Sequence, residues 1–397
     1  MSELKQKDST YVAGTYRRFP VEIVSGKGSV VYDETGKRYI DMGSGIGVTS
    51  FGIADDAWVA AVTEQLGRVQ HMSNLYYTEP CARLAEMLCE KTGMAKVFFC
   101  NSGAEANECA IKVARKYAAT KDPARTTIVT LVNSFHGRTL TTLAATGQEH
   151  YHELFQPLTP GFRHVEAGNM EQLAEAISAP DTAALLVECV QGEGGVIALA
   201  PTYVKEAQRL CRENDVLFMV DEVQTGNGRT GQLYAYMNFG VKPDVVSTAK
   251  GLGGGLPLGA ALLSEKVGNV LTFGDHGSTF GGNPVACAGA CSVISRMDDA
   301  FLAAVREKSA YCFAELSEAE GVESVSGMGL MVGIKTTAPA ADVVRECMAR
   351  GVLCLTAKDK VRLLPALNIP ADILAEAIGI IKTVCAELAA AQKESET

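Results

Sequence analysis

From about residue 95 onward, short and almost uniformly apolar runs alternate with longer segments of helical periodicity. The apolar runs are AKVFF, TTIVTLV, AALLVECV, VLFMVDEV, DVVSTA and GAALLS. Strands that are apolar on both faces and separated by helices are typical of a mostly parallel sheet covered on both sides. The sequence therefore predicts an α/β fold.

The regions before and after this alternation have a different pattern. The first 50 residues contain short strand-like pieces between glycine turns, and after about residue 300 two helix-like stretches flank short strands. A chain of 397 residues is about right for one large and one smaller domain. We predict a large domain over residues 51–298, and a smaller α+β domain built from residues 1–50 and 299–397. Helices are expected over residues 104–119, 201–214 and 284–297.

Composition excludes several classes of function. The formal net charge is −10 and there is no run of five basic residues, which argues against a nucleic-acid partner. The start MSELKQKDST lacks the apolar core of a signal peptide, and no stretch of about 18 apolar residues suits a bilayer. We therefore expect a cytoplasmic protein. The twelve cysteines contain no C-x-x-C pair, which favours buried reduced thiols over a metal site.

A turn at residues 101–107, NSGAEAN, follows one predicted strand and opens a predicted helix. The free N–H groups and the dipole at such a helix start favour an anion, especially a phosphate. Gly103 permits close approach of the backbone, and Ser102 adds a hydroxyl. Taken alone, the same pattern also suits an ordinary helix cap with a glycine turn.

Two charged residues follow consecutive predicted strands. Asp221 ends the run VLFMVD, and Lys250 follows the run DVVSTA. Ligands of open α/β sheets bind beyond the carboxyl ends of the strands, so both side chains are expected at one crevice. A lysine that is desolvated there has a lowered pKa, as a Schiff-base amine requires. A lone lysine at a strand end that reaches solvent remains the plainer alternative.

The segment SFHGRT provides an aromatic ring, a histidine and an arginine on one predicted loop. Phe135 can stack on a planar ligand, and Arg138 can hold a carboxylate with its planar guanidinium. His136 is open between a structural hydrogen bond and a place beside the ligand. Each residue alone is more often part of a core or a surface.

Seven segments in order resemble the class III (subgroup II) aminotransferases, over nearly the whole chain. They are TYRRFPV, NSGAEANECAIKVARKY, SFHGRT, VECVQGEGG, DEVQTGNGRTG, STAKGLGGGLPLGA and GSTFGGNP. The resemblance implies the fold of type I pyridoxal-5′-phosphate (PLP) enzymes and a homodimer with shared active sites. Metal ions have no part in the implied site, and the implied partners are small-molecule substrates.

The resemblance also implies roles for residues around the cofactor. Lys250 would form the Schiff base, and Asp221 would pair with the pyridine nitrogen. The remaining expected cofactor-binding residues are Ser102, Gly103, Ala104, Phe135, Glu222, Val223, Gln224 and Thr279. Among them, the turn at 102–104 would bind the phosphate, with Ser278 and Thr279 supplied by the partner subunit.

Substrate-binding residues are implied in the same way: Tyr16, Arg138, Glu193, Ser278 and Arg362. Arg138 would bind the α-carboxylate of an acylated ornithine, and Arg362 a carboxylate of glutamate or 2-oxoglutarate. Glu193 would neutralise Arg362 while an amine-ended substrate is bound. Gly45 and Ile46 leave room for an N-acyl group. The segment FGIADDAW departs from a Gly-His pattern of the family, and we expect this to alter only a surface turn.

Within the class, the strings HMSNLYYTEP, GSGIGV and TYRRFPV are most similar to the acetylornithine aminotransferase group. This implies transfer of a terminal amine to 2-oxoglutarate in arginine biosynthesis. Ornithine, succinylornithine, succinyldiaminopimelate and 4-aminobutyrate are alternative amine donors, because fold and cofactor motifs do not decide the substrate. A non-catalytic binding protein on the same scaffold is the alternative from another class.

Overall fold

The computed structural model describes residues 2–395 and contains a seven-stranded sheet with the strand order β4-β12-β11-β10-β7-β5-β6. The strands are β4 (Lys96–Cys100), β5 (Thr127–Leu131), β6 (Phe162–Val165), β7 (Thr182–Val187), β10 (Leu217–Asp221), β11 (Val245–Thr248) and β12 (Gly259–Leu263). Only β12 runs antiparallel to its neighbours within this sheet. The predicted α/β class and the six predicted strands are confirmed, and β6 is an additional edge strand.

Helices cover both faces of this sheet, as the alternation of its apolar residues requires. Phe218 and Val220 of β10 pack in the core that contains residues of α8 (Pro201–Glu213), while Leu217 and Met219 pack in the core that contains α5 (Gly103–Ala119). Neighbouring residues of a strand point to opposite faces, which explains the division. The predicted helices match α5, α8 and α10 (Pro284–Ser295) within two residues at either end.

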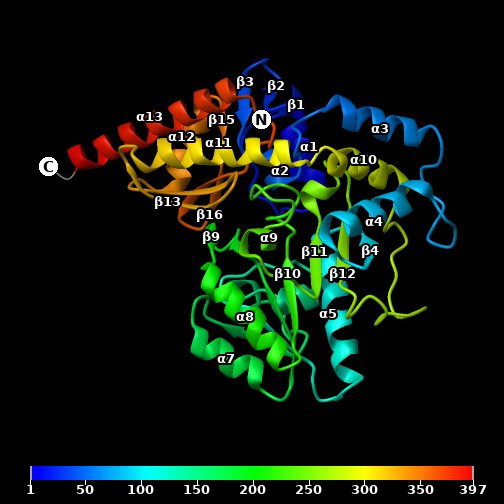
Figure 1. The fold of residues 1–397 in the computed structure, drawn as a ribbon. Coiled ribbons are helices and arrows are strands. Elements are labelled where there is room, and N and C mark those ends of the chain that lie inside the picture. The colour runs from blue at the N-terminus through cyan, green and yellow to red at the C-terminus, as the bar shows by residue number, and fades with distance from the viewer. Residues whose placement is uncertain (1, 396–397) are drawn as a thin grey trace.

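Both chain ends contribute to a second group of elements, which lies beside the large sheet in Figure 1. Its strands are β1 (Ile23–Lys27), β2 (Val30–Asp33), β3 (Arg38–Asp41), β13 (Val322–Met328), β14 (Met331–Thr336), β15 (Val352–Leu353), β16 (Leu355–Ala357) and β17 (Lys360–Leu363). Its helices are α11 (Asp299–Ser317), α12 (Ala340–Ala349) and α13 (Ala371–Ser395). Strand β15 extends the N-terminal sheet by pairing with β3. We therefore propose the smaller domain over residues 1–50 and 299–397, of which residues 1 and 396–397 lie outside the described range.

The remaining elements either cover the large sheet, as α7 does beside α8, or lie nearer to the second group. They are α1 (Glu3–Tyr11), α2 (Ser44–Gly47), α3 (Asp56–Leu66), α4 (Glu79–Thr92), α6 (Leu140–Ala145), α7 (Met170–Ser178), α9 (Tyr236–Phe239), β8 (Val190–Gln191), β9 (Ile197–Ala198) and the 3-10 turns η1 (Glu149–Tyr151) and η2 (Lys250–Leu252). None of the helices within residues 2–395 has the length and apolar composition needed to cross a membrane.

Candidate active site

A cavity of about 600 Å³ lies beyond the carboxyl ends of the central strands. Asp221 is the last residue of β10, Lys250 follows β11, and the turn after β4 begins α5. The following predicted site residues line the cavity: Tyr16, Ser102, Gly103, Ala104, Phe135, Arg138, Asp221, Val223, Gln224 and Lys250. Residues from distant parts of the sequence therefore meet in one hollow, as the strand-end rule predicts.

Asp221 is held by three hydrogen bonds at the floor of this cavity. Its Oδ2 accepts from Asn107 Nδ2 at 2.7 Å and from His136 Nδ1 at 2.8 Å, and its Oδ1 accepts from the Val223 N–H at 2.9 Å. The residue is only 3% exposed. Three donors around a buried carboxylate fix its orientation. His136 thus takes the structural part of its two possible roles while remaining on the cavity wall.

Lys250 has an unusual backbone conformation and a half-buried side chain. Its φ is 44°, in the left-handed region that residues other than glycine seldom adopt. Burial, partly offset by the charge of Glu193, lowers the pKa of the Lys250 amine below its ordinary value. A lowered pKa increases the fraction of neutral amine, the form that attacks a carbonyl carbon.

The turn before α5 is a capped helix start that faces the cavity, as the sequence predicts. Ser102 caps the helix by accepting from the Glu105 N–H at 3.2 Å, and its own hydroxyl donates to Glu105 Oε2 at 3.1 Å. A Cβ at Gly103 would lie 2.6 Å from Val223 Cγ1, so any side chain there would displace Val223 or fill the space between them. The glycine therefore keeps the cavity open at the helix N-terminus.

Arg362, Glu193 and Gln224 form a buried polar cluster beside the cavity. Arg362 of β17 donates from NH1 to Glu193 Oε1 at 2.6 Å and to Gln224 Oε1 at 3.1 Å, while Gln224 Nε2 donates to Glu193 at 3.2 Å. Burial alone would raise the pKa of the Glu193 carboxyl, but Arg362 holds it below its ordinary value. Arg362 is only 3% exposed, so its charge is balanced inside the protein by Glu193.

The predicted substrate residues at the cavity mouth are more exposed. Tyr16 has 74% of its surface accessible, and the Arg138 guanidinium lies 4.2 Å from the ring centre of Tyr151 and 5.4 Å from that of Phe135. Aromatic rings at these distances attract the cation through their faces. Arg138 thus places a positive charge at the cavity mouth, where a carboxylate can bind.

Three further predicted residues do not line the cavity within one chain. Glu222 is fully buried and accepts from Thr225 Oγ1 at 2.5 Å and from the Tyr236 N–H at 2.8 Å. Ser278 Oγ accepts from Asn101 Nδ2 at 3.1 Å, and Thr279 is exposed to solvent. Contact of these three with a cofactor stays a prediction.

Sequence reasoning missed Glu188, which lines the cavity and is 5% exposed. Its carboxylate accepts from the Phe135 N–H at 3.0 Å and from the Gly192 N–H at 3.3 Å. Burial raises the pKa of Glu188 to about 7, with His136 opposing this and Asp221 adding to it. Its position directly after the apolar strand β7 was the available signal, the same one that identified Asp221.

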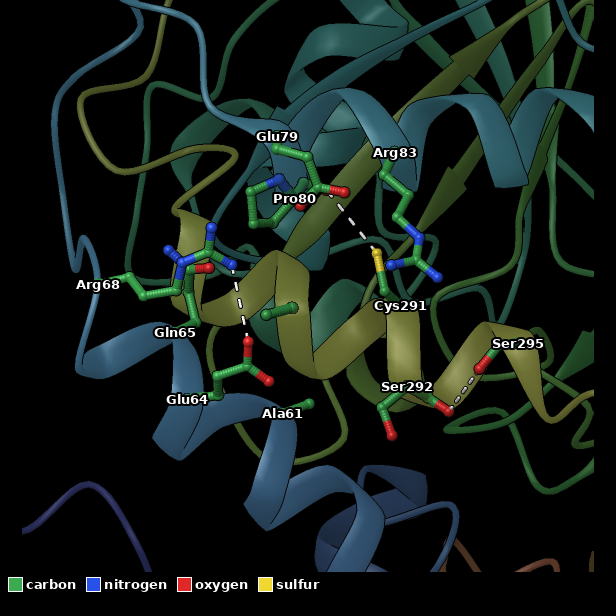
Figure 2. A pocket seen from close by; sticks show the side chains of 11 residues that line it. Ala61, Glu64, Gln65, Arg68, Glu79, Pro80, Arg83, Cys291, Ser292 and Ser295 are labelled. Atoms are coloured by element: carbon green, nitrogen blue, oxygen red, sulfur yellow. Dashed lines mark hydrogen bonds and ion pairs between the residues drawn. The ribbon is translucent and has the colours of Figure 1, made fainter.

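A second cavity, of about 250 Å³, lies among α3, α4 and α10 (Figure 2). It is lined by mixed charges, including Glu64 and Arg68, whose side chains are 3.7 Å apart, and none of the predicted site residues reaches it. Its acids and bases come from exposed helix faces. The chemistry predicted from sequence therefore belongs to the first cavity.

Comparison with known proteins identifies the family of the chain. Residues 11–385 match the model of the family described as aminotransferase class-III. An acetylornithine aminotransferase of Haemophilus ducreyi is 49% identical, covering 97% of this chain and 99% of that protein. An acetylornithine aminotransferase of Caldanaerobacter subterraneus subsp. tengcongensis is 43% identical, covering 96% and 98%.

Solved structures give the same result. An ornithine aminotransferase from Toxoplasma gondii, described with partial occupancy of PLP at its active site, has a TM-score of 0.93 and 31% identity, covering 99% of this chain and 96% of that one. An N-acetylornithine aminotransferase from Stenotrophomonas maltophilia K279a has a TM-score of 0.85 and 33% identity, covering 97% and 99%. The predicted type I fold is therefore confirmed.

The cavity suits PLP by the chemistry of its groups. Lys250 offers a primary amine, the buried carboxylate of Asp221 suits a protonated pyridine nitrogen, and the turn around Gly103 suits a phosphate. With this fit and with the family match over residues 11–385, the chain belongs to the class-III aminotransferases, which are PLP-dependent enzymes.

Proposed function

We propose that this enzyme transfers the terminal amine of N2-acetylornithine to 2-oxoglutarate, as a step of arginine biosynthesis. The single observation that carries the proposal is the identity of 49% to an acetylornithine aminotransferase over 97% of the chain. The geometry of the cavity agrees with it, because the paired Glu193 and Arg362 answer the need to accept both a terminal amine and a dicarboxylate.

Bound PLP supplies an electron sink that stabilises negative charge at the substrate carbon next to the amine. Asp221 holds a proton on the pyridine nitrogen, because its carboxylate is fixed by Asn107, His136 and the Val223 N–H. Lys250 in its neutral form would take a proton from the substrate carbon that bears the amine and return it to the former aldehyde carbon of PLP, so that the amino group stays with the cofactor. Its lowered pKa makes the neutral form available.

Two arginines separate the ends of the substrates. Arg138, stacked on Tyr151, binds the α-carboxylate of acetylornithine, with Tyr16 beside it at the mouth. Arg362 stays paired with Glu193 during that half-reaction and binds a carboxylate of 2-oxoglutarate when Glu193 moves away. Gly45 and Ile46, both in left-handed conformations, form the tight α2 segment that leaves room for the acyl group.

We further propose that the enzyme is a homodimer. Large exposed apolar side chains gather on two segments that Asn74 joins by donating to the carbonyls of Ser278 and Gly281, both at 2.9 Å. These side chains are Leu75, Tyr76, Tyr77, Phe273 and Phe280. A second copy would cover this surface and receive Ser278 and Thr279 at its phosphate turn. Sedimentation equilibrium tests this, and a monomer would contradict it.

A cytoplasmic location stays a prediction.

A panel of amine donors tests the substrate proposal. With 2-oxoglutarate as acceptor, kcat/KM should be highest for N2-acetylornithine and lower for ornithine, succinylornithine, succinyldiaminopimelate and 4-aminobutyrate. A preference for free ornithine or 4-aminobutyrate would overturn the choice of donor while leaving the transaminase assignment intact. Borohydride reduction that leaves no label on Lys250 would instead favour the non-catalytic alternative.

A further inference from the structure

Trp58 is the only tryptophan of the chain, and it lies in the segment FGIADDAW that departs from the family pattern. The expectation that this departure alters only a surface turn stays a prediction, and Trp58, at the end of the segment, makes a contact beyond that turn. The indole Nε1 donates to the Gly253 carbonyl at 3.0 Å, across a sequence separation of 195 residues. Gly253 belongs to the glycine-rich turn that follows Lys250.

Three glycines make room for the indole ring. A Cβ at Gly254 would lie 2.8 Å from Trp58 Nε1, and one at Gly255 would lie 3.6 Å from the six-membered ring. On the other side, a Cβ at Gly289 of α10 would also lie 2.8 Å from Nε1. The ring therefore fills the space between the glycine turn and α10. A side chain at Gly254 or Gly289 would clash with it, whereas Gly255 lies at an ordinary contact distance.

The turn that Trp58 contacts holds the backbone of Lys250. The Gly253 N–H donates to the Lys250 carbonyl at 3.2 Å, within the 3-10 turn that keeps Lys250 at a φ of 44°. The carbonyl of the same residue, Gly253, accepts from Trp58 Nε1 at 3.0 Å and from the Leu256 N–H at 3.3 Å. Because Leu256 lines the cavity, the same carbonyl links the indole to the cavity wall.

Trp58 is itself fixed at the start of α3. Asp55 caps this helix by accepting from the Trp58 N–H at 3.0 Å, and it pairs with Arg296 at the end of α10 at 2.8 Å. The Arg296 guanidinium lies 3.8 Å from the ring centre of Phe51. These contacts join α3 to α10. Figure 2 shows the two helices side by side around the second cavity.

We propose that Trp58 is a positioning residue for Lys250, acting through the carbonyl of Gly253 and the turn at 253–255. The inference rests on the proposed role of Lys250 as the lysine that binds PLP. It assigns this function to a tryptophan outside the cavity, on a helix that contributes no residue to the cavity lining.

Trp58→Phe tests the hydrogen bond, because it keeps an aromatic ring and removes the N–H donor. Loss of one such bond should weaken PLP binding to the apo-protein by about fivefold. The same variant should lower kcat by a similar factor and leave the KM values for both substrates within about twofold. Calorimetric titration with PLP gives the first value without any turnover. Val59→Ala, at an exposed neighbour on α3, is the matched control and should change neither.

Gly289→Ala tests the packing from α10, since its methyl group would lie 2.8 Å from Trp58 Nε1 and 3.1 Å from Val62 Cγ2 and would displace the indole. It should weaken PLP binding and shift the fluorescence maximum of the single tryptophan. In the Trp58→Phe background the methyl group of Gly289→Ala meets no Nε1 atom. The loss of PLP affinity caused by Gly289→Ala should therefore be less than half of the loss that it causes in the wild-type background.

The outcomes separate this inference from the proposed function. If the wild-type protein fails to bind PLP, the role of Lys250 is wrong. If it binds PLP but Trp58→Phe binds equally well with unchanged kcat, the positioning role is overturned. Should Trp58→Phe fail to fold, Gly289→Ala alone decides: unchanged PLP affinity would overturn the inference, and a loss with a shifted emission would support it.

Discussion

The inner and outer halves of the cavity are built differently. In the inner half, Asp221 and His136 are at most 3% exposed, and the carboxylate already has three hydrogen-bond donors from its own chain. In the outer half, Tyr16 is 74% exposed and Arg138 has aromatic rings as neighbours. The inner half, whose chemistry is common to all aminotransferases, is thus fixed by buried hydrogen bonds within the chain, while the outer half, which meets the varying part of the substrates, is held less tightly.

This difference makes a general prediction about mutations. Changes in the inner half should lower turnover with every amine donor, because they remove groups that act on the reacting atoms. Changes in the outer half should alter the ranking of donors and acceptors, and should act more on KM than on kcat. A substrate-dependent effect from an inner residue would break the distinction.

The largest effect is expected for Lys250→Ala. Removing the amine abolishes both covalent attachment of PLP and proton transfer at the substrate carbon, so no donor should turn over above background. Mass spectrometry after borohydride treatment should find no cofactor on the peptide that contains residue 250. Lys205→Ala, on the exposed face of α8, should keep both activity and label. Retained turnover in Lys250→Ala would show that another amine does the work.

Asp221→Asn should lower kcat by roughly 100- to 1,000-fold with every donor, because an amide cannot hold a proton on the pyridine nitrogen as a carboxylate does. Asn107 and His136 would remain as donors facing the amide, so PLP binding should weaken as well. Stopped-flow measurement of each half-reaction checks this. Asp215→Asn, the same change at a surface carboxylate, is the control. Near-normal rates would contradict the role of Asp221.

Variants of the Arg362–Glu193 pair should separate the two substrates. Arg362→Ala should raise KM about 10- to 100-fold for the dicarboxylate acceptor, as expected for loss of a charged hydrogen bond, and act less on acetylornithine. Glu193→Gln should instead raise KM more for acetylornithine than for the dicarboxylate acceptor. The change frees Arg362 for a dicarboxylate, and it leaves the Arg362 charge unbalanced beside an amine-ended donor. Each variant is the control of the other. Parallel changes in both KM values would refute the switch.

Much of the inner half could be predicted from sequence because strand ends meet at one edge of a sheet. Asp221 and Lys250 end or follow apolar strands, and the structure brings both to the same cavity. The resemblance to the family added Gln224 and Arg362, which no local pattern identified. Their meeting requires β17, near the chain end, to reach the loop after β10, and sequence spacing carries no information about such a contact.

Other features could not be predicted because their sequence patterns were weak or were interpreted in another way. Strand β6, with the sequence FRHV, lies at the edge of the sheet and has only one fully buried residue, so its apolar pattern is short. Glu188 followed an apolar strand as Asp221 did, but it lies in a segment used only for the resemblance. Trp58 lay in a departure from the family pattern, and its partner Gly253 is distant in sequence.

Glu188 lies at the boundary of the two halves, since it binds the N–H of Phe135 on one side and that of Gly192, beside Glu193, on the other. Burial raises its pKa from 4.5 to about 7, so the folded protein holds a proton that the unfolded chain has lost. The stabilising contribution of this group is therefore complete below pH 4.5 and is lost as the pH rises through about 7.

Glu188→Gln should remove this dependence, which amounts to at most about 1.4 kcal/mol per pH unit within that window. Denaturant unfolding of the apo-protein at pH 5, 6, 7 and 8 should thus show the variant gaining stability relative to wild type as the pH rises. Glu222, whose pKa burial also raises to about 7, is the matched control, and Glu222→Gln should show the same slope. Only the Glu188 variant should also shift the pH profile of kcat, because only its carboxyl lines the cavity. Identical pH profiles of kcat for the two variants would show that Glu188, like Glu222, has only a structural role. The inner half that acts on the reacting atoms would then include Asp221 but not Glu188.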